Sequence, residues 1–261
     1  MLSRDNIVFE FDALAHAHTV SQDTVKDELV VLVNKFMAEL GIYGLDKIVV
    51  KETKLWDVER GLADYKSNTI TLANNIAYCL ADKSSLLYPS SLAVLKHEMY
   101  HFLDYQNLVL NRARNNITQL DADVWNNYRY WTEFFASYST FEVCEDEELY
   151  SSFESVFEKS NSTCKEKKYF TCRLFGYYLH DSHSEKCDKL VAQYLSGKAL
   201  EKTVSSFKSV LQSYPCYSAE QLINVGLALN EVIETKDDIA SYTPISKEDF
   251  LKQMLNKPKR S

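Results

Sequence analysis

Glycine and proline are scarce in this sequence, and long apolar runs are missing. Only six glycines and four prolines occur among 261 residues, with no low-complexity tract and no internal repeat. This composition excludes collagen-like and disordered chains and favours a helix-rich globular protein. A membrane-spanning helix needs about 18 or more apolar residues in succession, and no segment approaches that length. We therefore expect no membrane partner.

Excess positive charge is also missing. The formal net charge is -8, and lysines and arginines gather only in short segments. Nucleic-acid binding relies on broad clusters of these residues, because they neutralise the phosphate backbone. We therefore expect no nucleic-acid partner.

Closely spaced cysteine pairs and a secretory leader are absent as well. None of the six cysteines forms a C-x-x-C pair, and no basic segment followed by an apolar run stands at the N-terminus. Scattered cysteines in a chain without a visible secretory signal are typical of free thiols in a reducing compartment. The expected location is cytoplasmic.

Apolar residues recur at helix and strand spacing along most of the chain. Hydrophobic residues make up 46% of it, which is enough for a sizeable core. Strands are predicted over 47–52 and 69–72, with Ser67-Asn68 as the turn before the second. Periodicity and capping residues predict helices over 21–40, 75–80, 90–107 and from Asp121 or Asp123 to about 143.

These elements predict an α+β fold. We expect a domain over residues 1–146, in which a small mixed β-sheet packs on the helix predicted over 90–107. An acidic run over 145–148 marks its expected boundary with a mainly helical C-terminal region, residues 147–261. That region forms a separate unit or packs as part of the same domain.

The helix predicted over 90–107 carries an H-E-x-x-H motif, formed by His97, Glu98 and His101. Residues four apart lie on one face of a helix, so both imidazoles can point at one ion. The glutamate projects beside that ion, where it can take a proton from water. The pattern predicts one Zn²⁺ per chain, with Glu98 as the general base. The alternative is a solvent-facing helix with local ion pairs.

Glu133 is the predicted third ligand. A catalytic zinc site takes three protein ligands and leaves one position open. Glu133 lies mid-helix among aromatic residues, where a carboxylate must be paired or must bind a metal. Ala136, about one turn further on, would let two helices approach closely. The alternative partner for Glu133 is Arg129, four residues earlier.

Further polar groups are expected around this site. Asp104 lies seven residues beyond His97, or about 10 Å along a helix axis, too far to share the ion. It is predicted to support a ligand imidazole or to be an exposed helix charge. A hydrolytic site also needs a group that stabilises an oxyanion. The candidates are Tyr130, Tyr138, His180 and His183.

Two histidines and a downstream glutamate resemble the ligand set of the gluzincins. The segment Glu133-Phe-Phe-Ala136 resembles the E-x-x-A second motif of the ImmA/IrrE-like metallopeptidases, and the resemblance covers about residues 21–143. It implies a zincin-like domain. It also implies an edge strand before the motif helix that pairs with an extended substrate. The residues expected to form this strand are Thr69, Ile70, Thr71 and Leu72.

The function that this resemblance implies is zinc-dependent hydrolysis of a peptide bond, with a protein or peptide as the substrate. The helical C-terminal region is expected to cover or extend the cleft. One alternative is a zincin-fold binding or regulatory protein that holds zinc without proteolysis. The other is a helical interaction protein in which the H-E-x-x-H motif is fortuitous.

Overall fold

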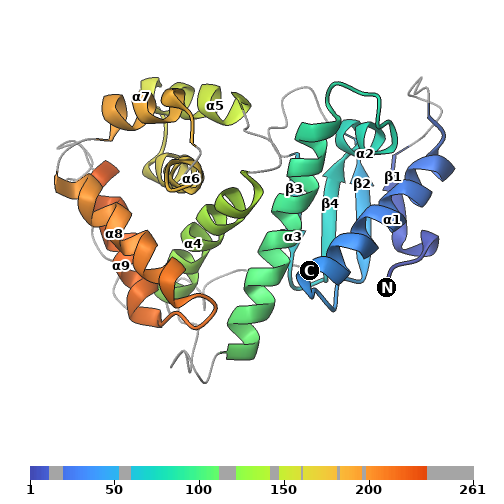
Figure 1. Cartoon of the computed structure of the whole chain (residues 1–261), viewed down its shortest axis with the longest axis horizontal. Helices are drawn as coiled ribbons and strands as arrows, with labels where there is room; N and C mark the ends of the chain where they lie inside the picture. The colour runs from blue at the N-terminus through green and yellow to red at the C-terminus, as the bar shows by residue number, and fades with distance from the viewer. Residues whose placement is uncertain are drawn as a thin grey trace, which may run out of the picture.

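The computed structural model describes residues 1–11, 20–52, 60–111, 122–141, 147–159, 161–180, 183–195 and 198–233. A four-stranded mixed sheet lies at one end of the molecule and a group of helices at the other (Figure 1). The expected α+β class is confirmed, and helices make up most of the described residues. The expected boundary at residue 146 falls in 142–146, outside the described residues.

The sheet consists of β1 (Ile7–Glu10), β2 (Lys47–Lys51), β3 (Gly61–Asp64) and β4 (Thr69–Ala73), in the order β1-β2-β4-β3. β1 and β4 pair with β2 in parallel, whereas β3 pairs with β4 in antiparallel fashion. The strands predicted over 47–52 and 69–72 are therefore present. β1 and β3 were not predicted, because neither segment alternates apolar with polar residues.

The prediction that Thr69–Leu72 form the edge of the sheet is wrong. β4 pairs with β2 on one side and with β3 on the other, so it is an inner strand. The predicted turn explains the difference: Asn68 adopts a left-handed φ of 51° and the chain reverses there. β3 thereby folds back along the outside of β4 and becomes the edge strand.

Two long helices, Gln22–Leu40 and Tyr88–Asn111, cover one face of the sheet. α1 (Gln22–Leu40) begins after Ser21, whose hydroxyl accepts a hydrogen bond from the backbone of Thr24. It ends at Gly41, which has a φ of 68° and takes the left-handed conformation common at helix ends. Both ends agree with the sequence prediction. A 3-10 turn (Arg4–Asn6), α2 (Asn74–Ala81) and α3 (Tyr88–Asn111) complete this half.

The core of this half lies between the sheet and its helices. The pairing register aligns two rows of apolar side chains across the strands, and these belong to one buried cluster with side chains from α1, α2 and α3. The first row is Ile7, Ile48 and Ile70, and the second is Phe9, Val50 and Leu72. Gly61 pairs with Leu72, so Gly61 lies on the same face as α3.

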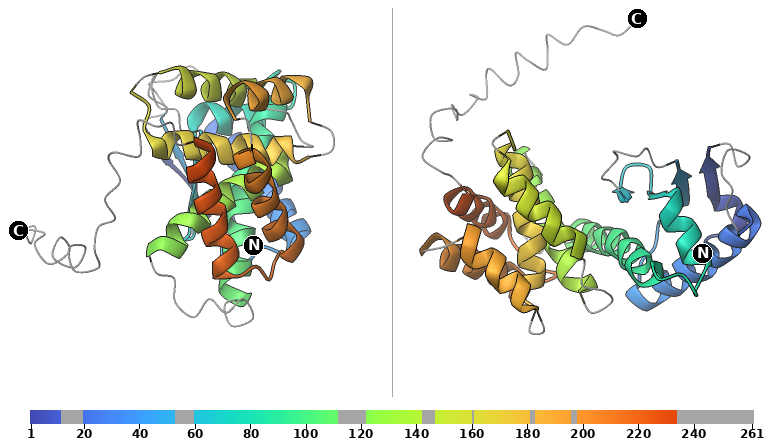
Figure 2. Two further views of the ribbon diagram at one scale, coloured as in Figure 1. Left: turned by 90° about the vertical axis from the view of Figure 1, so that its left-hand side faces the viewer. Right: turned by 90° about the horizontal axis from the view of Figure 1, so that it is seen from above.

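The second half consists of α4 (Ala122–Thr140), α5 (Glu147–Glu158), α6 (Cys164–Tyr178), α7 (Glu185–Tyr194), α8 (Lys198–Ser213) and α9 (Ala219–Ile233). Its core is a second buried cluster that is rich in aromatic rings, including Trp131, Phe134, Phe175 and Phe207. α3 lies between the sheet and these helices, as the view from above shows (Figure 2). The end of α3 joins the second cluster through Leu108.

α4 and α6 pack with their backbones unusually close. A Cβ atom on Gly176 of α6 would lie 2.7 Å from the carbonyl oxygen of Phe134 and 2.7 Å from the Cβ of Ser137. Only glycine permits this approach. As a result α6 packs directly against the part of α4 that includes Phe134, Ser137 and Tyr138, next to Glu133.

Two further expectations from the sequence are that no helix spans a membrane and that the cysteines are free thiols. Within the described residues, no helix combines the length and the apolarity required to cross a bilayer. The cysteines in this part of the chain are free thiols: Cys79, Cys164, Cys172, Cys187 and Cys216.

Candidate metal centre

α3 positions the H-E-x-x-H residues between the two halves of the molecule. The apolar side chains of its middle turns, Leu95, Met99 and Phe102, pack into the sheet core. This anchoring turns the other side of α3 towards α4, which carries Glu133. The exposed fractions of the His97, His101 and Glu133 side chains are 12%, 6% and 18%. The cluster is therefore largely withdrawn from water.

Potential ligand atoms from three residues converge at this point. The Nε2 atoms of His97 and His101 lie 3.1 Å apart. Oε2 of Glu133 lies 3.5 Å from Nε2 of His97, and Oε1 lies 3.7 Å from Nε2 of His101. The carboxylate thus faces both imidazoles. The structure brings together the three residues that the sequence predicted as ligands.

The spacing of these atoms fits a small tetrahedral cation. With zinc–ligand distances of about 2.0–2.2 Å, neighbouring ligand atoms in a tetrahedral site lie roughly 3.3–3.6 Å apart. The three observed separations are within a few tenths of an ångström of that range. Oε2 of Glu133 is also buried and makes no hydrogen bond within the described residues. A buried carboxylate oxygen in that state requires a positive partner.

His101 is held in a form that suits metal binding. Its Nδ1 lies 3.0 Å from the hydroxyl of Thr132, and a proton donated there leaves the lone pair of Nε2 facing the cluster. Burial lowers the pKa of His101 to about 3, although the Glu133 carboxylate opposes this shift. The charges of His97 and Arg173 lower it further. A neutral imidazole is the form that ligates a metal.

Glu98 lies between the cluster and the edge of the sheet. A Cβ atom on Gly61 of β3 would lie 2.8 Å from both Cγ and Oε1 of Glu98. The glycine therefore creates the space that the glutamate side chain occupies. Glu98 is only 7% exposed, so its carboxylate is held against β3 and beside the two histidines.

A cleft of about 640 Å³ opens from this cluster. α3 contributes His97 and Glu98 to one wall, and Gly61 of β3 lies at its edge. The opposite wall is formed by α5 and α6, so the helical C-terminal region does cover the cleft. Its lining residues include Ser151, Ser155, Lys159, Tyr169 and Arg173.

Tyr169 and Arg173 are site residues that the sequence did not reveal. They lie one turn apart on α6, and the guanidinium carbon of Arg173 is 5.9 Å from the centre of the Tyr169 ring. Burial raises the pKa of Tyr169, and the carboxylates of Glu133 and Glu98 raise it further, whereas Arg173 lowers it. The phenol therefore stays protonated and can donate a hydrogen bond.

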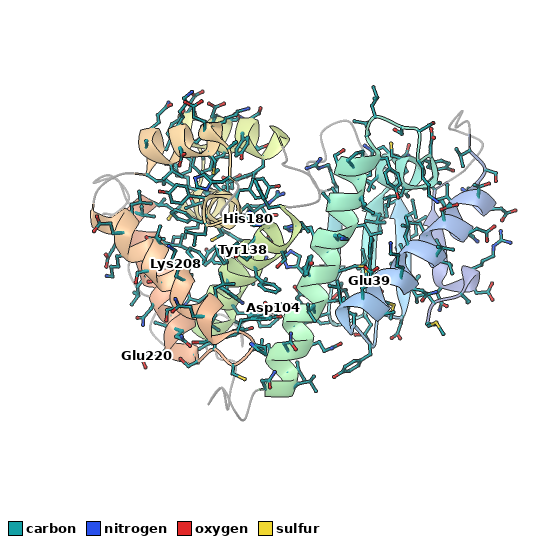
Figure 3. All side chains as sticks on the ribbon, in the orientation of Figure 1. Glu39, Asp104, Tyr138, His180, Lys208 and Glu220 are labelled. Atoms are coloured by element: carbon teal, nitrogen blue, oxygen red, sulfur yellow. The ribbon has the colours of Figure 1, made fainter. Side chains whose placement is uncertain are left out.

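The tyrosine and histidine residues predicted to stabilise an oxyanion do not line the cleft. The rings of Tyr138 and His180 pack against each other with centres 5.6 Å apart (Figure 3). Tyr130 packs against the helical core, with the Lys168 ammonium 6.0 Å from its ring centre. His183 pairs with Asp188 at 3.0 Å. Which side chains reach the cleft depends on how the helices pack, and the sequence does not give that packing.

Asp104 neither contacts a ligand imidazole nor lies on the surface. It is fully buried between α3 and α4 (Figure 3). Its Oδ1 accepts hydrogen bonds from Nε1 of Trp131 at 3.2 Å and from the hydroxyl of Tyr217 at 3.1 Å. The alternative of an exposed helix charge is therefore wrong, and Asp104 is not the direct partner of a ligand imidazole. Thr132, one residue before Glu133, is the direct partner of His101 instead.

A scan against protein-family models, a search of curated proteins and a search of solved structures each returned no match. The geometry of the cluster and the residues around it therefore carry the functional assignment.

Proposed function

We propose that this chain is a zinc-dependent peptidase of the gluzincin type. The observation that carries the proposal is the convergence of Glu133 with His97 and His101, with separations of 3.1–3.7 Å between their ligand atoms. Further support comes from Glu98, which lies beside this cluster, and from the cleft onto which both open. The resemblance of the sequence to ImmA/IrrE-like metallopeptidases agrees with this assignment.

In this proposal His97, His101 and Glu133 hold the zinc ion. Bound zinc supplies a Lewis acid that polarises a carbonyl and lowers the pKa of water to about 7. The carboxylate of Glu98 accepts a proton from the attacking water and then returns it to the nitrogen of the leaving amine. The hydroxyl of Tyr169 donates to the oxygen that gains negative charge on the tetrahedral carbon.

β3 offers a backbone surface for an extended substrate. The Arg60 carbonyl accepts a hydrogen bond from the amide of Ala73 in the neighbouring strand. Bonded and non-bonded pairs alternate in an antiparallel ladder, so Gly61 and Ala63 direct their amides and carbonyls to the outer side. No described strand pairs with that side. A peptide added there would run past Glu98.

Peptide hydrolysis by the zinc-loaded protein tests this proposal. Untagged protein is incubated with a mixed library of quenched fluorescent peptides, and Glu98→Gln is compared with the wild type. Hydrolysis is expected to fall by about a thousandfold or more in Glu98→Gln, with zinc content unchanged. Glu39→Gln, on the exposed side of α1, serves as the matched control and should retain full activity.

Two outcomes would contradict the proposal. If the zinc-loaded wild type cleaves no peptide in the library, the peptidase assignment fails and a zinc-holding binding protein remains. If Glu98→Gln cleaves as fast as the wild type, Glu98 is not the base.

A further inference from the structure

The cleft next to the cluster is lined by positively charged side chains, although the protein as a whole is negatively charged. The chain as a whole has a formal charge of -8, yet Arg60, Lys159 and Arg173 all line the cleft. Among the described residues that line the cleft, two are carboxylates, Glu98 and Glu166. Glu98 is the proposed base, and Glu166 accepts hydrogen bonds from the amide and hydroxyl of Thr163 at 2.7 and 2.8 Å.

The three cations come from separate elements that meet at the cleft. Arg60 directly precedes β3, Lys159 follows the end of α5, and Arg173 lies in the third turn of α6. The Tyr169 ring supports the guanidinium of Arg173 from one side. This convergence is a property of the tertiary structure, because no two of the three residues are neighbours in the sequence.

Hydroxyl groups complete the same wall. Ser151, Ser152 and Ser155 of α5 line the cleft together with Lys159. Serine hydroxyls can donate hydrogen bonds to an anion without adding charge. The wall opposite the metal ligands therefore offers both positive charge and neutral donors.

We propose that this wall binds a carboxylate of the substrate, with Arg173 as the main contact. The inference rests on the proposed peptidase function and names its substrate class: peptides with a carboxylate close to the bond that is cleaved. A guanidinium presents two parallel donors that match the two oxygens of a carboxylate. The carboxylate is either the C-terminus of the peptide or the side chain of an aspartate or glutamate.

A small anionic group fits this cleft better than a polyanion does. The cavity has a volume of about 640 Å³, which suits a few residues of a peptide. The negative charge of the rest of the protein repels a long polyanion. Bound at Arg173, a carboxylate would fix how far the peptide extends past the cluster.

Binding of four matched peptides tests the inference. Each is a fluorescein-labelled hexapeptide of alanines with one glutamate or glutamine, and its C-terminus is either free or amidated. Fluorescence anisotropy measures their affinity for zinc-loaded Glu98→Gln, in which turnover is blocked. At least one carboxylate-bearing peptide is expected to bind about tenfold more tightly than the neutral amidated glutamine peptide. Tighter binding of the peptides with a free C-terminus identifies the C-terminal carboxylate as the group that binds. Tighter binding of the glutamate peptides identifies the side-chain carboxylate instead.

Variants in the Glu98→Gln background assign the contact. Arg173→Gln should reduce the preference to less than about twofold, whereas Lys208→Gln should retain it. Lys208 is exposed on α8, away from the cleft (Figure 3). Circular dichroism checks that each variant folds. If Arg173→Gln does not fold, the four-peptide comparison in the Glu98→Gln protein, in which Arg173 is intact, still tests the inference.

Three results would overturn the inference: equal affinity for all four peptides, no binding of any, or a preference that persists in Arg173→Gln. The assay reads binding and not turnover, so it separates this inference from the proposed function. A carboxylate preference in a protein that cleaves nothing would refute the peptidase alone. Turnover in the wild type without such a preference would refute the carboxylate site alone.

Discussion

The hydroxyl of Thr132 lies 3.0 Å from Nδ1 of His101, and both residues are buried. Thr132 directly precedes Glu133 in α4. One turn of α4 therefore supplies both a proposed ligand and the group that orients another ligand. Residues that fix a ligand imidazole in this way commonly change metal affinity by about 10- to 100-fold when they are replaced.

Replacing Thr132 with valine should weaken zinc binding about tenfold or more. The variant keeps the shape of the side chain but removes the hydroxyl that holds His101. Competition with a chelator of known affinity measures the effect. Thr203→Val is the control, because Thr203 is also buried but its hydroxyl bonds to Ala199 and Ala228. It should lower stability without changing zinc affinity, and equal zinc affinity in both variants would contradict the role of Thr132.

Gly61→Ala should reduce peptide hydrolysis while zinc remains bound. The new Cβ would lie 2.8 Å from Oε1 of Glu98, so the carboxylate must move away from its position beside the cluster. A displacement of about 1 Å can cost on the order of a hundredfold in rate. Steady-state kinetics and zinc content are measured together. Leu62→Ala changes the exposed neighbour in β3 and should leave the rate within about twofold; an unchanged rate in Gly61→Ala would contradict the placement of Glu98.

Two glycine substitutions should differ in their effect on stability. Gly176→Ala places a Cβ 2.7 Å from a backbone oxygen of α4, so a helix must shift. The expected loss is about 1–3 kcal/mol in the free energy of unfolding. For Gly226→Ala the three atoms nearest to the new Cβ all belong to the side chain of Asn127 and not to the backbone, so a side-chain adjustment suffices, and the variant gains about 1 kcal/mol of helix propensity. Urea unfolding ranks the two, and the reverse order would contradict the described packing of α4 on α6.

Asp104 should make stability depend on pH. Burial raises the pKa of Asp104 to about 6, although the hydrogen bonds from Trp131 and Tyr217 oppose the shift. Because this pKa exceeds the unfolded value of about 3.9, the favourable contribution is complete below about pH 4 and is lost as the pH rises through 6. The size of the change is on the order of 3 kcal/mol.

The comparison of the wild type with Asp104→Asn isolates this contribution. Unfolding in urea is measured with a chelator present at several pH values from 4 to 7. The difference in unfolding free energy between the two proteins should shift in favour of Asp104→Asn as the pH rises. Glu39→Gln, an exposed substitution on α1 (Figure 3), supplies the baseline. A difference that stays constant across the range would contradict the raised pKa.

Local patterns explain what could be predicted from the sequence. The bounds of α1 follow from Ser21 and Gly41, whose capping roles depend only on adjacent residues. The spacing of His97 and His101 places them on one helix face wherever the helix lies. Glu133 was found because a carboxylate among aromatic residues needs a partner.

The features that were missed depend on tertiary packing. Tyr169 and Arg173 line the cleft because α6 packs on α4, and Gly176 permits the close approach of these two helices. The sequence carries one sign of α6, the capping box of Thr163 and Glu166, but nothing local says which face of that helix meets the cluster. In the same way, β4 has the alternation of an edge strand, and only the return of β3 makes it an inner strand.

Zinc content tests the central claim most directly. Protein purified without a histidine tag is reconstituted with zinc, dialysed and measured by mass spectrometry, alongside Glu133→Ala and Glu39→Ala. The account predicts about one zinc per chain in the wild type and in Glu39→Ala, and a loss or sharp weakening of binding in Glu133→Ala. No zinc in the reconstituted wild type, or undiminished zinc in Glu133→Ala, would contradict it.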